Sequence, residues 1–557
     1  MTVRRIPFSL HANVVLTEFS RVFDKKVKPL KRYYFLLIFL LCGVFLLLSS
    51  SHFHQPGLYY DEALDAALAT DLISPGPPQV PSLYLPLSGL NFPLLTQRYA
   101  GSLKTYLLLP FFVLFGPGVV TLRAVMAGLG LANLLLTYRL ARCFMDRFPA
   151  FFVLLLLTLD PNFVFETGID WGPSALSYLL RVAGCLFLIE GWRKKRKAMI
   201  TAAMGSFFLG IYNRATFHLF LVPFLAALLW FFREKMRVAL RVGLLDRNHL
   251  YAFLILGTAL TVCFLSQIPL EVMKNAWPGI WKIALFMEFL KGESLVKQIV
   301  GASGCEAGTA SLWALLLVTL LLSWWRRSRS RRLQEQQCQE LNFLSGYSLL
   351  TLVLLLVLPG VRYTHYFLHL YPFLHLMVGV LLQSLYEGAF SGTSRSGRPA
   401  FVLYIYLAVV LITAETGFLT IQKAARLFRV TGGAGSWSDA IFDVSHYLLQ
   451  QSGKRIVCPR QGFDRNLFVL TGGKIRIRRL GRRNFKEDFQ NLLRDPENLY
   501  LFQGHFPGFS RDDLFRWAEE AGFRLTPLKP FFERTGGIVY SVYAASPIRE
   551  GPHPNHP

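Results

Sequence analysis

Three carboxylates stand where the chain could use them for proton transfer. Asp61 and Glu62 lie together in the segment YYDEA, shortly after the first long apolar stretch. Acids in a first helical turn can simply oppose the helix dipole, but their place beside a bilayer favours a function. Asp170, in FETGIDWGPSAL, either caps the next helix or acts with them. Two loops that each present a carboxylate would suit a general base and an orienting acid.

Four cations lie in segments on the same predicted side of the membrane as these acids. They are Arg98 and Lys104 in QRYAGSLKTY, Arg214 in GIYNRATFH, and Arg362 in LPGVRYTHYF. Each one alone is more typical of a side chain that snorkels or pairs with a lipid headgroup. Taken together, they could balance the charge of a phosphate leaving group.

Three histidines follow Arg362. His365 and His369 have the i, i+4 spacing of one helix face, and His375 comes next. Two histidines indicate a metal site only weakly, and a packed or headgroup-facing role is more typical of such a pair. A divalent cation is therefore a possible cofactor that the sequence does not establish, and no other cofactor is indicated.

The elements that must position these residues are membrane-spanning helices. The chain has 557 residues, of which 53% are hydrophobic, and leucine-rich runs recur along most of it. Each run is long enough to cross a hydrocarbon core of about 30 Å. We expect about eleven spans, near 34–50, 119–139, 149–165, 172–191, 198–212, 216–232, 250–268, 309–325, 341–358, 366–386 and 401–420.

Charge sets the expected orientation. The net charge of +25 comes from short basic clusters beside the apolar runs, which predicts cytoplasmic turns rather than nucleic-acid binding. Residues 1–33 then form a cytoplasmic tail, and the acid-bearing loops 52–118 and 160–175 face outward. The apolar run 103–115 is short, so we interpret it as a re-entrant or interfacial helix.

The residue pattern of the sequence changes after the last predicted span. Residues 34–420 form the expected membrane domain, whereas 421–557 alternate between helix and strand patterns, which predicts a small extracytoplasmic α/β domain. A basic strand and turn at 476–483 is typical of a solvated or headgroup-facing patch. The predicted fold class is thus an α-helical polytopic membrane protein with a small C-terminal α/β domain.

The order of these motifs resembles that of the C-type membrane glycosyltransferases, called GT-C. It is closest to glycosyltransferase family 39, whose relatives include protein O-mannosyltransferases and the lipid A aminoarabinose transferase. The matching pieces are YDEA after the first span, the segment YAGSLKTYLLLPFFVLFGP with Arg123 after it, the acid-bearing loop after the third span, and RYTHYFLHLYP. They cover roughly residues 30–390. Where many relatives have KPPL, this chain has QRYAGSLKTY.

The resemblance implies an activity and roles for the residues. The donor would be a sugar on a polyprenyl or dolichyl phosphate, and the acceptor an unidentified hydroxyl on a lipid, glycan or protein. Asp61 would be the base of an inverting transfer, Glu62 would assist it, and Asp170 would match the acid of the second loop. Arg362 with His365 would face the donor phosphate, and Arg214 stands where relatives often have a Lys. With Arg98 and Lys104 from the group of cations, these residues make up the predicted phosphate-binding set.

Two other classes of function remain open from the residues alone. A transporter also carries intramembrane charges, but it should place polar residues near the bilayer midplane and often shows an internal repeat. A non-catalytic binder of lipid-linked sugars would share the same site. A channel is disfavoured because no polar stripe recurs along the spans. The absence of an Asn-x-Ser/Thr site favours a bacterial inner membrane.

Overall fold

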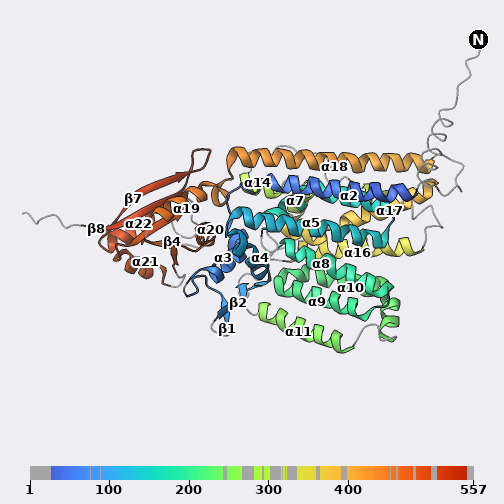
Figure 1. Ribbon diagram of the computed structural model, residues 1–557, viewed down its shortest axis with the longest axis horizontal. Coiled ribbons are helices and arrows are strands. Elements are labelled where there is room, and N and C mark those ends of the chain that lie inside the picture. Colours follow the sequence, from blue (N-terminus) through green and yellow to red (C-terminus); the bar gives the residue numbers. More distant parts are fainter. Residues whose placement is uncertain are drawn as a thin grey trace, which may run out of the picture.

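The molecule is elongated, with a bundle of long helices at one end and a domain with a β-sheet at the other (Figure 1). The structure is a computed structural model. The residues that it describes are 27–75, 77–87, 90–171, 174–241, 247–265, 281–291, 294–300, 315–316, 318–319, 321–322, 335–358, 364–390, 398–451, 453–458, 462–480, 484–503 and 511–548.

The bundle is built from helices that match most of the predicted spans. Within the described ranges, six helices are long and apolar enough to cross a membrane, or seven if the bent pair α6–α7 is one span. The span predicted at 309–325 lies mostly outside those ranges, so the count of about eleven stays a prediction. The helices are α2 (Val27–Ser50), α5 (Val119–Phe144), α6 (Arg147–Thr158), α7 (Pro161–Gly168), α8 (Ser174–Arg193), α9 (Lys197–Asn213), α10 (His218–Arg241), α11 (Arg247–Leu265), α13 (Trp281–Lys291), α14 (Ser294–Val300), α16 (Glu335–Val357), α17 (Phe373–Phe390) and α18 (Arg398–Thr431), with the 3-10 helices η1 (Ala215–Phe217) and η3 (Thr364–Leu370).

One predicted span is broken in a way that the sequence explains. Helices α6 and α7 meet at 60°. Pro161 cannot continue the hydrogen-bond ladder of α6, and it disfavours a helical conformation at Asp160. Asp160 instead caps α7 by accepting a hydrogen bond from the backbone N–H of Phe163 at 3.0 Å. The break brings α7 back into the interior, where all its residues are buried.

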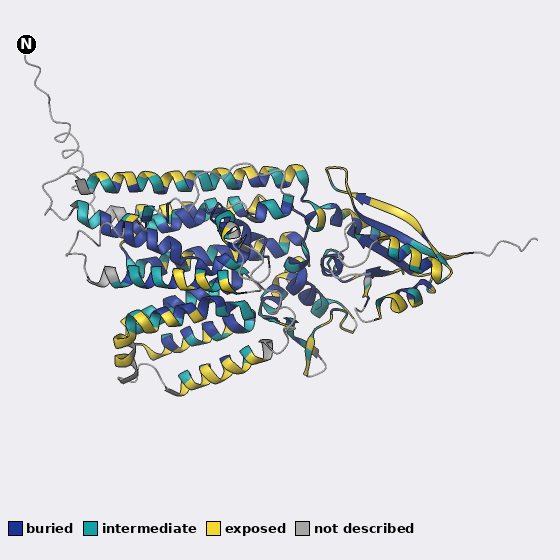
Figure 2. Ribbon diagram, turned by 180° about the vertical axis from the view of Figure 1, so that it is seen from behind, coloured by how far each residue is buried: buried dark blue, intermediate teal, exposed yellow. Residues whose placement is uncertain are grey.

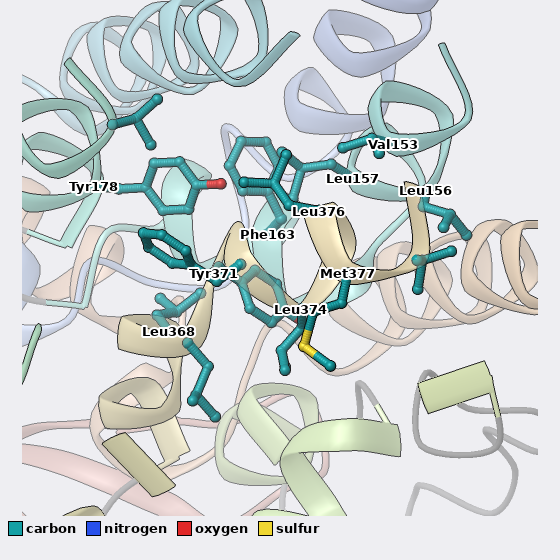
Figure 3. Close-up of a cluster of buried hydrophobic side chains, with 14 of the residues drawn as sticks. Val153, Leu156, Leu157, Phe163, Tyr178, Leu368, Tyr371, Leu374, Leu376 and Met377 are labelled. Atoms are coloured by element: carbon teal, nitrogen blue, oxygen red, sulfur yellow. The ribbon is translucent and has the colours of Figure 1, made fainter. Parts of the chain in front are cut away.

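The core of the bundle is apolar and aromatic. Phe163 of α7 and Tyr178 of α8 pack with ring centroids 5.4 Å apart, and Tyr371, in the turn before α17, belongs to the same cluster with Leu368 and Leu376 (Figure 3). Exposed residues gather on the outer faces of the helices and buried ones on the inner faces (Figure 2). Because those outer faces carry large apolar side chains, they suit lipid, and the chain is an integral membrane protein.

The loop between α2 and α5 folds into its own small layer at the end of the bundle. It contains helix α3 (Tyr60–Ile73), strands β1 (Leu83–Leu87), β2 (Leu90–Gln97) and β3 (Ala100–Gly101), and helix α4 (Leu103–Phe115). The strands pair antiparallel in the order β1-β2-β3, a sheet that the sequence did not reveal. With 13 residues, α4 is too short for a full span.

The C-terminal domain has the alternating elements that the sequence predicts. Its sheet has the order β5-β4-β6-β8-β7, in which β4 runs parallel to β5 and β6. The bounds are α19 (Ala440–Gln450), β4 (Arg455–Cys458), α20 (Asp464–Leu470), β5 (Arg476–Arg479), α21 (Phe485–Leu493), β6 (Asn498–Gln503), α22 (Arg511–Glu520), β7 (Phe523–Phe532) and β8 (Ile538–Pro547), preceded by the 3-10 turn η4 (Gly435–Trp437).

This domain packs directly on the loop that carries the YDEA motif. Asn466 of α20 donates a hydrogen bond from its side chain to the carbonyl of Leu58, next to the start of α3. The N–H of Gly57 donates to the carbonyl of Trp437 at 2.8 Å. A Cβ at Gly57 would lie 2.2 Å from the carbonyl oxygen of Ser438, so only glycine allows the two backbones to approach this closely.

We therefore expect Gly57→Ala to destabilise the protein by about 1–3 kcal/mol, because the added methyl group must push the two backbones apart. The matched control is Gly128→Ala in α5, where nothing lies within 4 Å of the added Cβ. Thermal unfolding in detergent measures both variants. Equal melting temperatures for the two would contradict the close approach.

Candidate active site

Helix α3 separates the two adjacent acids of the YDEA motif onto different faces. The helix begins after Tyr59, whose backbone N–H donates to the Glu62 carboxylate at 3.4 Å. Successive residues of a helix point about 100° apart, whereas residues four apart share a face. Asp61 therefore shares its face with Asp65, and Glu62 points elsewhere.

Glu62 forms a buried ion pair with Arg123 of α5. The guanidinium donates to both carboxylate oxygens, from Nε at 2.7 Å and from Nη2 at 2.9 Å. It also donates to the carbonyls of His52 at 3.0 Å and Pro56 at 2.9 Å, and both side chains of the pair are fully buried. The pair thus ties the start of α3 and the preceding loop to a helix of the bundle.

Asp61 is held by a tryptophan from the second loop. The indole Nε1 of Trp171 donates to Oδ2 of Asp61 at 2.9 Å. Burial raises the pKa of Asp61 above its ordinary value of 3.8, although the Trp171 hydrogen bond and the charge of Arg214 act to lower it. Asp61 remains partly exposed, so a hydroxyl group can approach it.

A second carboxylate cluster surrounds Lys104 at the start of α4. Its ammonium lies 2.6 Å from Oδ2 of Asp170, and neither side chain is exposed. The other oxygen of Asp170 accepts from the N–H of Ala175 at 2.8 Å, so this residue both pairs with a cation and caps α8. Burial alone would lower the pKa of Lys104, but Asp170 and Asp65 outweigh it, so the net shift is upward and the ammonium stays charged. Asp170 has a φ of 51°, in the left-handed region that a residue other than glycine rarely adopts.

Arg214 lies near both Asp61 and the Lys104–Asp170 pair. Burial acts to lower the pKa of Arg214, but Tyr366 and Tyr99, followed by Asp61 and Asp170, outweigh it and raise the pKa above its ordinary value. Its guanidinium lies 5.9 Å from the Tyr99 ring, and its Nε has no hydrogen-bond partner among the described residues. The ring of His365 packs 4.7 Å from that of Trp171. An anion that enters beside Asp61 therefore meets a guanidinium with an unused donor.

The two remaining histidines point into separate parts of the bundle. Nδ1 of His369 lies 3.2 Å from Nη1 of Arg181 in α8, and Nε2 of His375 lies 3.3 Å from the carboxylate of Asp160. The described part of the chain holds no group of three or more His, Cys, Asp or Glu side chains that could bind a metal ion.

The structure brings together most of the residues that the sequence singled out. Asp61, Asp170, Lys104, Arg214 and His365 gather at the end of the bundle that faces the C-terminal domain. Glu62 lies beside them but pairs with Arg123. Arg98 is exposed in the turn between β2 and β3, and Arg362 lies outside the described residues.

Three residues of this region were missed by sequence reasoning. The i, i+4 spacing from Asp61 would have pointed to Asp65, whose Oδ1 accepts from Thr96 at 2.7 Å. Trp171 directly follows Asp170, but nothing in the sequence shows that its N–H reaches Asp61. Glu166 is fully buried in α7, and neither of its oxygens has a hydrogen-bond partner among the described residues.

Comparison with solved structures identifies the fold. No protein-family model matches the sequence, and neither does any curated protein. The structure is similar to that of ArnT from Cupriavidus metallidurans in the apo state, with a TM-score of 0.58 and 13% identity over 93% of this chain and 98% of that one. ArnT bound to undecaprenyl phosphate gives a TM-score of 0.54 and 13% identity over 92% and 98%. The Archaeoglobus fulgidus oligosaccharyltransferase with zinc and sulfate gives 0.49 and 12% over 90% and 72%. The chain has the GT-C fold, which confirms the resemblance at that level.

The buried ion pair leads to a stability prediction. Arg123→Met leaves the charge of Glu62 buried without its partner, which should cost about 3–5 kcal/mol. The double variant Glu62→Met/Arg123→Met should recover part of this loss, because it removes both charges. Recovery should be incomplete, because the carbonyls of the 52–57 loop still lose their donor. Melting temperatures of the purified proteins test this, and a single variant as stable as the wild type would contradict it.

Proposed function

We propose that this protein transfers a sugar from a polyprenyl phosphate carrier to an acceptor hydroxyl, with inversion at the anomeric carbon. The observation that carries the proposal is the setting of Asp61. Its partly buried carboxylate, fixed by the Trp171 N–H at 2.9 Å, lies beside a guanidinium at the end of a membrane bundle. A general base and a site for a phosphate are thus side by side.

In the proposed reaction, Asp61 accepts the proton of the acceptor hydroxyl. The hydroxyl oxygen then attacks the anomeric carbon, and the bond from that carbon to the phosphate oxygen breaks, with its electron pair leaving on the phosphate. General-base help of this kind contributes about 10²- to 10⁴-fold. The raised pKa of Asp61 makes its carboxylate a stronger base than an exposed aspartate, because the neutral form is favoured in its surroundings.

Arg214 is our candidate for the main phosphate ligand. Its Nε has no partner among the described residues, so it can donate to a phosphate oxygen without breaking an existing hydrogen bond. Lys104 is already paired with Asp170 and would act through its charge rather than by direct contact. His365 lies against Trp171 and would line the same site. We keep Arg362 as a further candidate for contact with the phosphate, and Arg98 as a candidate at the exposed edge of the site.

We assign Glu62 and Asp170 positioning roles. Glu62 fixes the first turn of α3 through Arg123, and Asp170 fixes Lys104 and the start of α8. Each contact sets the direction of a helix end that carries part of the site. Glu62 and Asp170 therefore assist the base by fixing its position, because an error of about 1 Å in the position of a catalytic group can cost 10²-fold in rate.

The similarity to ArnT bound to undecaprenyl phosphate supports this donor class, because both chains share a fold that in ArnT accommodates such a lipid. We propose that the site faces the outside of a bacterial inner membrane and that the C-terminal domain is extracytoplasmic, as the basic clusters of the sequence favour. The nature of the sugar, a hexose or a pentose, and of the acceptor depends on side chains that the donor would touch.

We expect Asp61→Asn to lower the turnover by about 10²- to 10⁴-fold, because the amide cannot accept the proton. Asp170→Asn should also lower it, because Lys104 loses its charged partner. Release of undecaprenyl phosphate in native vesicles, from a panel of undecaprenyl-phosphate hexoses and pentoses, measures turnover without knowledge of the acceptor. Asp512→Asn on the exposed surface of α22 is the control. Normal turnover by Asp61→Asn would refute the assignment of the base, and normal turnover by Asp170→Asn would refute the role of the Lys104–Asp170 pair.

The same assay gives a pH prediction. Asp61 acts only when ionised, so turnover should fall as the pH drops through its raised pKa. Trp171→Phe removes a hydrogen bond that stabilises the ionised form, which raises this pKa further and moves the acid limb of the pH profile to higher pH. The control, Trp230→Phe on the outer surface of α10, should leave the acid limb of the pH profile unchanged. An acid limb that Trp171→Phe leaves unmoved would show that a group other than Asp61 controls it.

A further inference from the structure

Trp437 brings the C-terminal domain into contact with residues that hold the proposed base. It lies in the 3-10 turn η4, between the last long helix, α18, and the first helix of the C-terminal domain, α19. Only 6% of its surface is exposed, which is unusual for so large a side chain in a connecting turn. None of the roles described above uses it.

The indole of Trp437 holds two aromatic residues of the site. Its ring stacks on that of Tyr59, with centroids 4.0 Å apart and planes at 8°. It also meets the ring of Trp171 edge to face, at 5.9 Å and 87°. Tyr59 in turn meets Trp171 at 6.0 Å and 87°. Aromatic pairs with such geometry contribute about 0.5–1.5 kcal/mol each beyond their buried area, so the three rings fix one another.

Each of these two partners, Tyr59 and Trp171, helps to position Asp61. Tyr59 is the residue that precedes α3, so its position sets where the first turn of that helix begins. Trp171 donates the hydrogen bond to the Asp61 carboxylate. The carbonyl of Trp437 also accepts from Gly57, which fixes the loop before Tyr59. Trp437 thus supports the base in two ways, through its backbone carbonyl to Gly57 and through its indole to the rings of Tyr59 and Trp171.

The C-terminal domain holds Trp437 in place. Gln503 of β6 donates to the Ser436 hydroxyl at 2.9 Å, and the Glu533 carboxylate accepts from the N–H of Gly435 at 2.6 Å. Arg534 donates to Asp439 at 2.6 Å on the other side of the turn. These contacts come from the sheet and its last hairpin, and the N–H of Ala434 also donates to the carbonyl of Ile299 in α14, so the turn is held by both the domain and the bundle.

We propose that Trp437 is a positioning residue for the transfer reaction, through which the docked C-terminal domain fixes Asp61 and its hydrogen bond from Trp171. This inference rests on the proposed function, because it gives Trp437 its importance through Asp61. It assigns the C-terminal domain a part in catalysis itself. Movement of the domain away from α3 would withdraw the indole and leave the base misplaced.

The test compares Trp437→Ala with Trp437→Phe in the full-length protein, using undecaprenyl phosphate release from the most active donor of the panel. Trp437→Ala should lower kcat by about 10- to 100-fold, because the base and its hydrogen bond lose their alignment. The effect on KM should be smaller, since Arg214 is untouched. The acid limb should move to higher pH, as for Trp171→Phe. Trp437→Phe keeps an aromatic face against Tyr59 and should restore most of kcat and the position of the limb.

The matched control is Trp517→Ala, an equal deletion in α22, where the ring packs on Phe485 away from the site. It should leave both kcat and the acid limb unchanged at a temperature where all variants are folded. If Trp437→Ala loses only thermal stability and keeps its kcat and limb, its role is structural and the inference is overturned. Normal turnover by Asp61→Asn would instead refute the proposed function. An inactive Asp61→Asn beside a fully active Trp437→Ala would overturn this inference alone.

Discussion

The position of Asp61 depends on the buried ion pair between Glu62 and Arg123. An arginine without exposed surface is costly unless its charge and its donors are satisfied, and here a carboxylate and several loop carbonyls satisfy them. Because these groups come from α3, α5 and the loop after α2, the pair leaves α3 little freedom to rotate. Asp61, which directly precedes Glu62 in α3, then points toward Trp171 and the second loop. Of the two neighbouring acids of the motif, Glu62 thus fixes the helix and Asp61 faces the site.

The electrostatics of the site follow from that arrangement. Asp65, Asp170 and Glu166 are buried around Lys104 and Arg214, so carboxylates outnumber the cations in this cluster. Lys104 is engaged by Asp170, whereas Arg214 keeps an unused donor beside Asp61. This unused donor is the reason that we propose Arg214 as the phosphate ligand. The C-terminal domain covers the same end of the bundle through Trp437 and α20, so membrane helices, a loop layer and the domain all contribute to one site.

The sequence predicted the elements better than the contacts between them. Apolar length and basic clusters located most helices of the bundle, and alternating patterns located nearly all the elements of the C-terminal domain, because both signals are local. The break at Asp160-Pro161 and the hairpin of β1 and β2 were not predicted. The structure brings Asp61, Asp170, Lys104, Arg214 and His365 to one end of the bundle, and their roles stay a prediction. The partner of Glu62 and the contacts of Trp171 and Trp437 depend on distant segments meeting in space, which no spacing rule reveals.

The stereochemistry of the product tests the central claim most directly. A base at Asp61 that activates the acceptor implies a single displacement, so a donor of known anomeric configuration must give a product of the opposite configuration. NMR spectroscopy of the glycosylated acceptor, isolated after transfer from such a donor, measures this configuration. Our account predicts inversion. Retention would require a covalent sugar–enzyme intermediate or its equivalent, and it would contradict the role that we assign to Asp61.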